Sequence, residues 1–112
     1  MRVNNEFITR RYDDSVVVAN RNIDGILDAT AQNYLTDPNL GDSPQVKRVT
    51  IAGMEGLYTR IQLGNEESVL IMLCLQLMSA ESPNTYNLSY QYRENGRKPL
   101  YDREGFLAAV QE

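Results

Sequence analysis

The change of hydropathy period along the chain is the feature that most constrains its fold. In residues 23–36, apolar side chains recur at offsets of 3, 4, 8, 11 and 12 from Ile23, which places them on one face of a helix. From residue 46 onward, apolar and polar side chains alternate, which is typical of strands with one buried face. A helix followed by strands joined through short turns predicts an antiparallel sheet with helices packed on it.

The predicted elements fill most of the chain. Asn22 is placed to cap the helix at 23–36, and Pro38 is placed to end it. A second helix is predicted from Tyr101 or Asp102 to Val110, because Phe106, Leu107 and Val110 form an apolar stripe. The predicted strands lie at 7–12, 15–19, 46–52, 57–63, 68–78 and 85–93. We therefore expect one α+β domain over residues 1–112, in the order β-β-α-β-β-β-β-α. It would have an antiparallel sheet of about six strands and two helices covering one side.

Composition excludes most catalytic classes. The 112 residues include no His, no Trp and one Cys, which rules out His-based triads, His-ligated zinc and disulfide frameworks. Gly53 and Gly56 lie between two predicted strands, so they indicate a hairpin and not a phosphate loop. The acidic pairs at 13–14 and 66–67 are typical of solvated turns, and Asp37 and Asp42 lack the spacing of a calcium loop. The sequence predicts no catalytic residue, no cofactor and no metal.

The charge distribution constrains the partners. The formal net charge is -4, and neither half of the chain is polarised. Basic residues occur at most in pairs, which disfavours nucleic acid. The longest apolar run, 69–75, is far shorter than the ~20 residues of a membrane span, and the polar N-terminus lacks a signal-peptide core. We expect an acidic, cytoplasmic protein without a membrane span, in which Cys74 serves as a small buried hydrophobe.

The tyrosine content is the feature that most strongly indicates a binding surface. Seven of the nine aromatic residues are Tyr, a residue type enriched at protein interfaces. Tyr side chains at 86, 90 and 92 share one strand face. That face either packs into the core beneath the helices or forms an exposed surface that binds a partner protein. Tyr58 with Arg60 is a second candidate patch, although a single exposed Tyr is also common without a binding role. Met54 is expected to be exposed at a hairpin tip, either as a contact residue or as a solvated loop residue. The predicted partner-binding residues are Met54, Tyr58, Arg60, Tyr86, Tyr90 and Tyr92.

One family shows a similar order of motifs. The segment 49–58, VTIAGMEGLY, resembles the strand, Gly-rich turn and strand signature of PsbP-like and DcrB-like domains. The preceding helix at 23–36 and the closing segment from Tyr101-Asp102 to Val110 resemble the same pattern, so the resemblance covers roughly residues 15–112. It implies a domain that is not an enzyme. The group includes photosystem accessory subunits, bacterial lipoproteins, a nuclear-import regulator and chaperone-adaptors for secreted effectors, and the likeness is one of fold.

Three functional hypotheses follow. The first is a bacterial, non-catalytic protein-binding domain that holds one partner protein, as a secretion chaperone-adaptor or as an immunity protein that neutralises a toxin. The partner would be a basic toxin or secreted effector, and the sheet would also allow a homodimer. The second is an accessory domain with a small molecule or lipid between sheet and helices, contacted by Tyr34, Tyr90 and Tyr92, which requires a cavity of several hundred cubic ångströms. The third, an enzyme built on carboxylate and Tyr or Lys chemistry, requires acidic groups that converge in a cleft.

Overall fold

The described part of the chain forms a five-stranded antiparallel sheet with one helix on each face. The computed structural model describes residues 8–13, 22–65, 68–79, 84–94 and 99–111. The sheet has the spatial order β1-β5-β4-β3-β2, and all its neighbouring strands are antiparallel. Its elements are β1 (Ile8–Asp13), α1 (Ile23–Thr36), β2 (Gln45–Ile51), β3 (Met54–Asn65), β4 (Ser68–Met78), β5 (Asn84–Glu94) and α2 (Arg103–Ala109).

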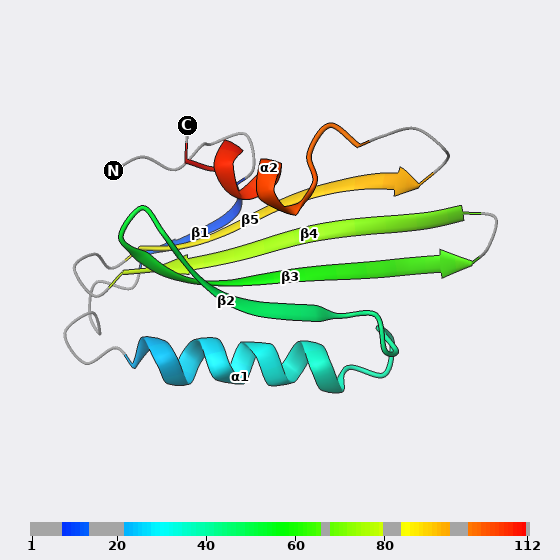
Figure 1. The fold of residues 1–112 in the computed structure, drawn as a ribbon. Coiled ribbons are helices and arrows are strands. Elements are labelled where there is room, and N and C mark those ends of the chain that lie inside the picture. Colours follow the sequence, from blue (N-terminus) through cyan, green and yellow to red (C-terminus); the bar gives the residue numbers. More distant parts are fainter. Residues whose placement is uncertain (1–7, 14–21, 66–67, 80–83, 95–98, 112) are drawn as a thin grey trace.

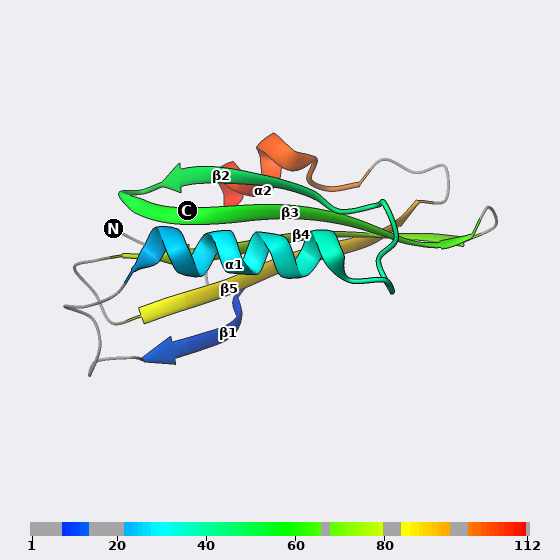
Figure 2. The same cartoon turned by 90° about the horizontal axis from the view of Figure 1, so that it is seen from below.

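The α+β class and the antiparallel sheet are confirmed, whereas the expected placement of the helices is wrong. α1 runs beneath the sheet along its strands and α2 lies above it, so the helices cover opposite faces (Figures 1 and 2). The reason is that both faces of the central strands are apolar, so each needs its own cover. The predicted strand at 15–19 and the turn before it lie outside the described residues.

The ends of α1 follow from its sequence. The Asn22 side chain accepts a hydrogen bond from the backbone N–H of Gly25 at 3.1 Å, as a cap does. Thr36 is the last helical residue, and Asp37 is already extended because the following Pro38 disfavours helical backbone there. Both predicted boundaries of this helix are confirmed. The second helix is shorter than predicted, and Asp102 caps it by accepting from Gly105 N–H at 2.7 Å.

The hairpin between β2 and β3 is tighter than predicted. Ile51 pairs directly with Met54, so the turn consists of Ala52 and Gly53, with φ angles of 53° and 80°. Two consecutive residues with positive φ match the two-residue turns whose twist suits a hairpin. Gly56, assigned from sequence to the turn, instead lies inside β3 opposite Val49. This shorter turn brings Met54 into the sheet.

The core lies mainly between the sheet and α2. Phe106, Ala109 and Val110 pack with apolar side chains of all four strands from β2 to β5 in one cluster of buried residues. A smaller cluster of Leu27, Leu57 and Met78 joins α1 to the opposite face. On α1 itself Leu27 is fully buried, whereas Ile26 and Leu35 of the same predicted stripe are 38% and 47% exposed. The apolar stripe of α1 is therefore wider than its contact with the sheet.

Candidate functional site

The predicted tyrosine face is mostly internal packing. Tyr86, Tyr90 and Tyr92 of β5 are half-buried and pack against the core cluster beneath α2. The Tyr90 ring meets that of Tyr101 edge to face at 5.1 Å, and its hydroxyl accepts a hydrogen bond from the Leu100 N–H at 3.0 Å. Of the two interpretations of this face, the structure supports core packing. Tyr90 and Tyr92 keep part of their surface in solvent, beside a Leu100 that is 78% exposed.

Two of the other predicted contact residues are buried. Met54 is 4% exposed, so the expectation that it lies exposed at a hairpin tip is wrong. The cause is the two-residue turn, which makes Met54 the first residue of β3 and directs it into the core cluster. Tyr58 is 3% exposed, because α2 covers the face that its strand pattern indicated as polar. Arg60 on the same face stays partly exposed.

A groove of about 560 Å³ lies between α1 and the opposite face of the sheet. Thr30 and Tyr34 of α1 line one side, and β3, β4 and β5 form the floor. Burial raises the pKa of the Tyr34 hydroxyl above its usual value, so Tyr34 stays neutral in water near pH 7. The residues that line this α1 groove are Thr30, Tyr34, Leu57, Thr59, Met72, Cys74, Leu75, Gln76, Asn87, Leu88 and Ser89. None of these side chains carries a charge at neutral pH.

Cys74 lies in the floor of the α1 groove, half-buried and not in a disulfide. Burial raises the pKa of its thiol to about 11. The thiol is therefore protonated at neutral pH, which makes it a poor nucleophile and a poor metal ligand. Cys74 was predicted to be a small buried hydrophobe; it is instead half-buried and lines the groove.

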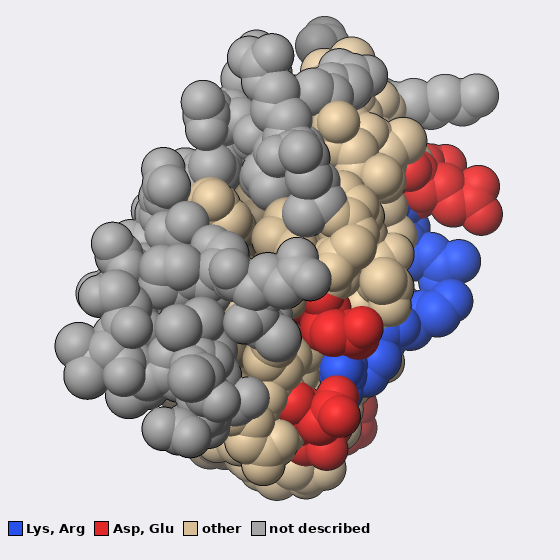
Figure 3. All heavy atoms as spheres, turned by 90° about the vertical axis from the view of Figure 1, so that its left-hand side faces the viewer, with Lys and Arg blue, Asp and Glu red and all other residues tan. Residues whose placement is uncertain are grey.

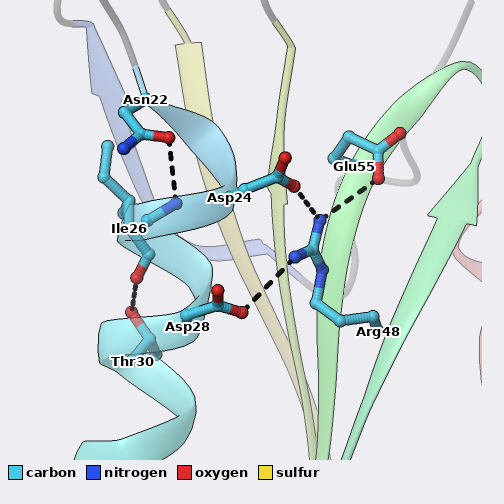
Figure 4. Close-up of polar contacts among 8 residues, drawn as sticks. Asn22, Asp24, Ile26, Asp28, Thr30, Arg48 and Glu55 are labelled. Atoms are coloured by element: carbon cyan, nitrogen blue, oxygen red, sulfur yellow. Dashed lines mark hydrogen bonds and ion pairs between the residues drawn. The ribbon is translucent and has the colours of Figure 1, made fainter.

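Arg48 on β2 joins α1 to the β2–β3 hairpin (Figure 4). Its Nη2 donates to Asp24 Oδ1 at 2.9 Å and to Glu55 Oε2 at 3.3 Å, and its Nη1 lies 3.6 Å from Asp28 Oδ1. The hydrogen bond to Asp24 raises the Arg48 pKa, and the charges of Asp24 and Asp28 act in the same direction. Viewed from the end where α1 begins, basic and acidic side chains interleave along one edge of the molecule (Figure 3). We interpret this network as an attachment for α1.

On the α2 face, the structure brings together basic residues that the sequence did not connect. A cleft of about 410 Å³ is lined by Gln45, Val46, Lys47, Tyr58, Arg60 and Arg103. Tyr58 and Arg60 were predicted as a pair, and the structure adds Lys47 from β2 and Arg103 from α2. The pairing of Lys47 with Tyr58 follows from the two-residue hairpin, whereas nothing in the sequence pattern placed Arg103 nearby.

Some of the acidic residues that the structure describes gather around Arg48, and others lie in turns and caps. Asp37 accepts from the Asn39 N–H at 2.9 Å, as an acidic residue does in a turn. Within the ranges the structure describes, no three His, Cys, Asp or Glu side chains group closely enough to hold a metal ion. Of the predicted acidic pairs, Asp14, Glu66 and Glu67 lie outside those ranges. No helix in the described part of the chain is long and apolar enough to cross a membrane.

Comparison of the chain with the models of known protein families, with curated proteins and with solved structures finds no match. The resemblance to PsbP-like and DcrB-like domains stays a prediction.

Proposed function

We propose that the protein is a non-catalytic binding domain that takes a small, uncharged molecule in the α1 groove. The observation that carries this proposal is the volume of about 560 Å³ between α1 and the sheet. It falls in the range of ~300–1,000 Å³ typical of small-molecule sites. The hypothesis of a ligand between sheet and helix requires a cavity of several hundred cubic ångströms, and the α1 groove has that volume.

The lining of the groove supports a ligand of mixed polarity. Leu57 and Met72 offer apolar contact, whereas Thr59, Gln76 and Ser89 offer hydroxyl and amide groups. A charged ligand would lose its hydration without gaining a partner of opposite charge, which is costly. The Tyr34 ring at the wall adds an apolar surface with a hydrogen-bonding tip. Tyr90 and Tyr92, which were expected to contact the ligand as well, lie on the other face and have no part in it.

The test uses Nile red, a neutral dye whose fluorescence rises in apolar surroundings. Ser89→Phe places an aromatic ring in the groove, whereas Gln91→Phe places the same ring on the same strand face at an exposed residue outside the lining. We expect wild type and Gln91→Phe to bind the dye equally and Ser89→Phe to bind about tenfold more weakly, or ~1.4 kcal/mol. A wild type that leaves the dye unchanged, or equal binding by all three proteins, would refute the proposal.

Alkylation of Cys74 gives a second readout, because its thiol lines the same groove. Bound dye should slow the reaction of N-ethylmaleimide with Cys74 in the wild type. Reaction rates that do not respond to a saturating dye concentration would place the dye elsewhere.

A second candidate function is the holding of one partner protein, as a secretion chaperone-adaptor or as an immunity protein in the cytoplasm. Its support is an aromatic and basic surface on the α2 face, made of Arg60, Tyr90, Tyr92 and the exposed Leu100. Tyr and Arg are the residue types enriched at protein interfaces. The decisive experiment is a pull-down from the native host with wild type and with Tyr92→Ala. A stoichiometric partner that is lost from Tyr92→Ala supports this function, and recovery of none counts against it.

A further inference from the structure

The cleft on the α2 face gathers positive charge in a molecule whose formal net charge is -4. Lys47 of β2 lies directly opposite Tyr58 of β3, and Arg60 follows two residues later on the same face of the sheet. Arg103, the first residue of α2, also lines the cleft. Among the six lining residues there are three cations and no carboxylate. This basic cleft is separate from the α1 groove, because the two lie on opposite faces of the sheet.

Among the described residues, no carboxylate forms an ion pair with a cation of the basic cleft. Throughout the described ranges, the ion pairs within 4.0 Å all involve Arg48, which lies on the α1 side. Arg60 has a long hydrogen bond of 3.5 Å, from its Nη1 to Gln62 Oε1. Arg103 has an acidic neighbour on each side in sequence, Asp102, whose Oδ1 accepts the capping bond from Gly105 N–H, and the exposed Glu104. Neither is among the ion pairs of the described residues. Like charges gathered without counter-charges create a local positive potential that attracts an anion.

The Tyr58 hydroxyl is the second, independent sign of a ligand. Tyr58 is 3% exposed, and its buried hydroxyl makes no hydrogen bond to any residue that the structure describes. Buried polar groups almost always have a partner, so one without any calls for an explanation. Burial raises the pKa of Tyr58, while the charges of Arg60 and Arg103 act to lower it. Both arginines line the same cleft as Tyr58.

We propose that the basic cleft binds the phosphate group of a small phosphorylated molecule. The guanidinium groups of Arg60 and Arg103 would donate to its oxygens, since their fork of N–H donors matches phosphate geometry. Lys47 adds a third positive charge, and the Tyr58 hydroxyl donates to a phosphate oxygen and so gains its missing partner. The cleft, at about 410 Å³, is larger than a phosphate ion and leaves room for the organic part. This site is independent of the function proposed for the α1 groove.

The test is a titration followed by amide chemical shifts, with inorganic phosphate and with phenyl phosphate at constant ionic strength. We expect saturable shifts centred on Lys47, Tyr58, Arg60 and Arg103, and tighter binding of phenyl phosphate. Arg60→Gln and Arg103→Gln should each weaken binding about tenfold. Arg93→Gln is the matched control, because Arg93 is an exposed arginine on the α1 side of β5 that donates to Ser68 Oγ. The proposal fails if phosphate causes no local shifts, or if Arg93→Gln weakens binding as much as Arg60→Gln.

Tyr58→Phe separates ligand binding from folding. It removes the unpartnered hydroxyl and keeps the buried ring, so binding of phenyl phosphate should weaken about tenfold. Its urea midpoint should equal or exceed that of the wild type, because no hydrogen bond within the protein is lost. A lower midpoint would show that the hydroxyl has a structural partner, and unchanged binding would show that it faces no phosphate. Either result overturns the assignment.

Discussion

The two helices of this protein cover the same sheet in opposite ways. α2 has 7 residues, and Phe106 and Ala109 within it and Val110 directly after it are all buried. α1 has 14 residues, and Leu27 is the buried one among them. The longer helix thus buries less of itself, and it gains an attachment from the ion pairs of Arg48. Helix length does not predict helix attachment; the number of apolar side chains that reach the core does.

The two faces also differ in what they leave open. The α1 groove has an uncharged lining, whereas the basic cleft on the α2 face has three cations. The sheet can separate these environments because neighbouring residues on a strand point to opposite faces. In β3, Thr59 lines the groove while Tyr58 and Arg60 line the cleft. Five predictions test how far the two faces are independent.

The largest expected effect is at Phe106, which anchors the α2 face. Phe106→Ala should lower the free energy of unfolding by about 3–5 kcal/mol, because a fully buried aromatic ring is replaced by a cavity. Urea denaturation followed by circular dichroism measures the loss. Leu107→Ala, in the same helix but only half-buried, is the control and should cost less. Equal losses for the two variants would mean that α2 is not anchored through Phe106.

Leu27 is the corresponding residue on the α1 face. Leu27→Ala should cost about 2–4 kcal/mol, since its side chain is buried against Leu57 and Met78. Because α1 has no second buried anchor, the loss should appear first as local opening of the helix. Hydrogen exchange should quicken in residues 26–36 while amides of β4 and β5 keep most of their protection. Equal acceleration everywhere would show that α1 and the sheet open as one unit.

The Cys74 thiol links stability to pH on the α1 side. The pKa of the thiol is about 11 in the folded protein and lower in the unfolded chain. The contribution of the thiol to the free energy of unfolding is therefore fully present below the unfolded pKa and is lost as pH rises through the folded pKa. Between about pH 8 and about pH 10.5 this group alone should remove ~2 kcal/mol. Cys74→Ala keeps Tyr34 and Tyr58, whose pKa values burial also raises, so the difference between the two pH profiles isolates the thiol. Parallel profiles would contradict a buried, protonated Cys74.

Arg48 tests the electrostatic part of the α1 attachment. Arg48→Met should lower stability by about 1 kcal/mol, because partly exposed ion pairs that form a network contribute at that level. The effect should shrink at high salt, where exposed charges are screened. The Met side chain keeps the apolar stem against the sheet. A loss that is the same at low and high salt would mean that Arg48 acts through packing.

The parts of the fold that the sequence predicts are those decided locally. The cap at Asn22 and the stop before Pro38 each depend on neighbours within a few residues, and both are as expected. The alternation along β3 identifies the strand but not what covers its faces, since Tyr58 on the expected polar face is buried. The side of the sheet that α2 covers depends on contacts between Phe106 and distant strands. The hydropathy pattern around Phe106 therefore does not predict it. The basic cleft is harder still to predict from the sequence, because Lys47 and Arg103 lie far apart along the chain and only the fold brings them to one cleft.

The smallest predicted effect concerns the hairpin that corrected the position of Met54. Ala52 has a φ angle of 53°, a backbone region that disfavours residues other than Gly, Asn and Asp. Asn suits this position in two-residue hairpin turns, so Ala52→Asn should raise the free energy of unfolding by about 0.5 kcal/mol. Thermal denaturation, with Ala108→Asn at an exposed helical position as control, measures the gain against a substitution that should instead cost stability. If Ala52→Asn is destabilising, the turn does not have positive φ at residue 52. The hairpin would then be longer and would no longer hold Met54 in the core, and the pairing of Lys47 with Tyr58 that builds the basic cleft would shift with it.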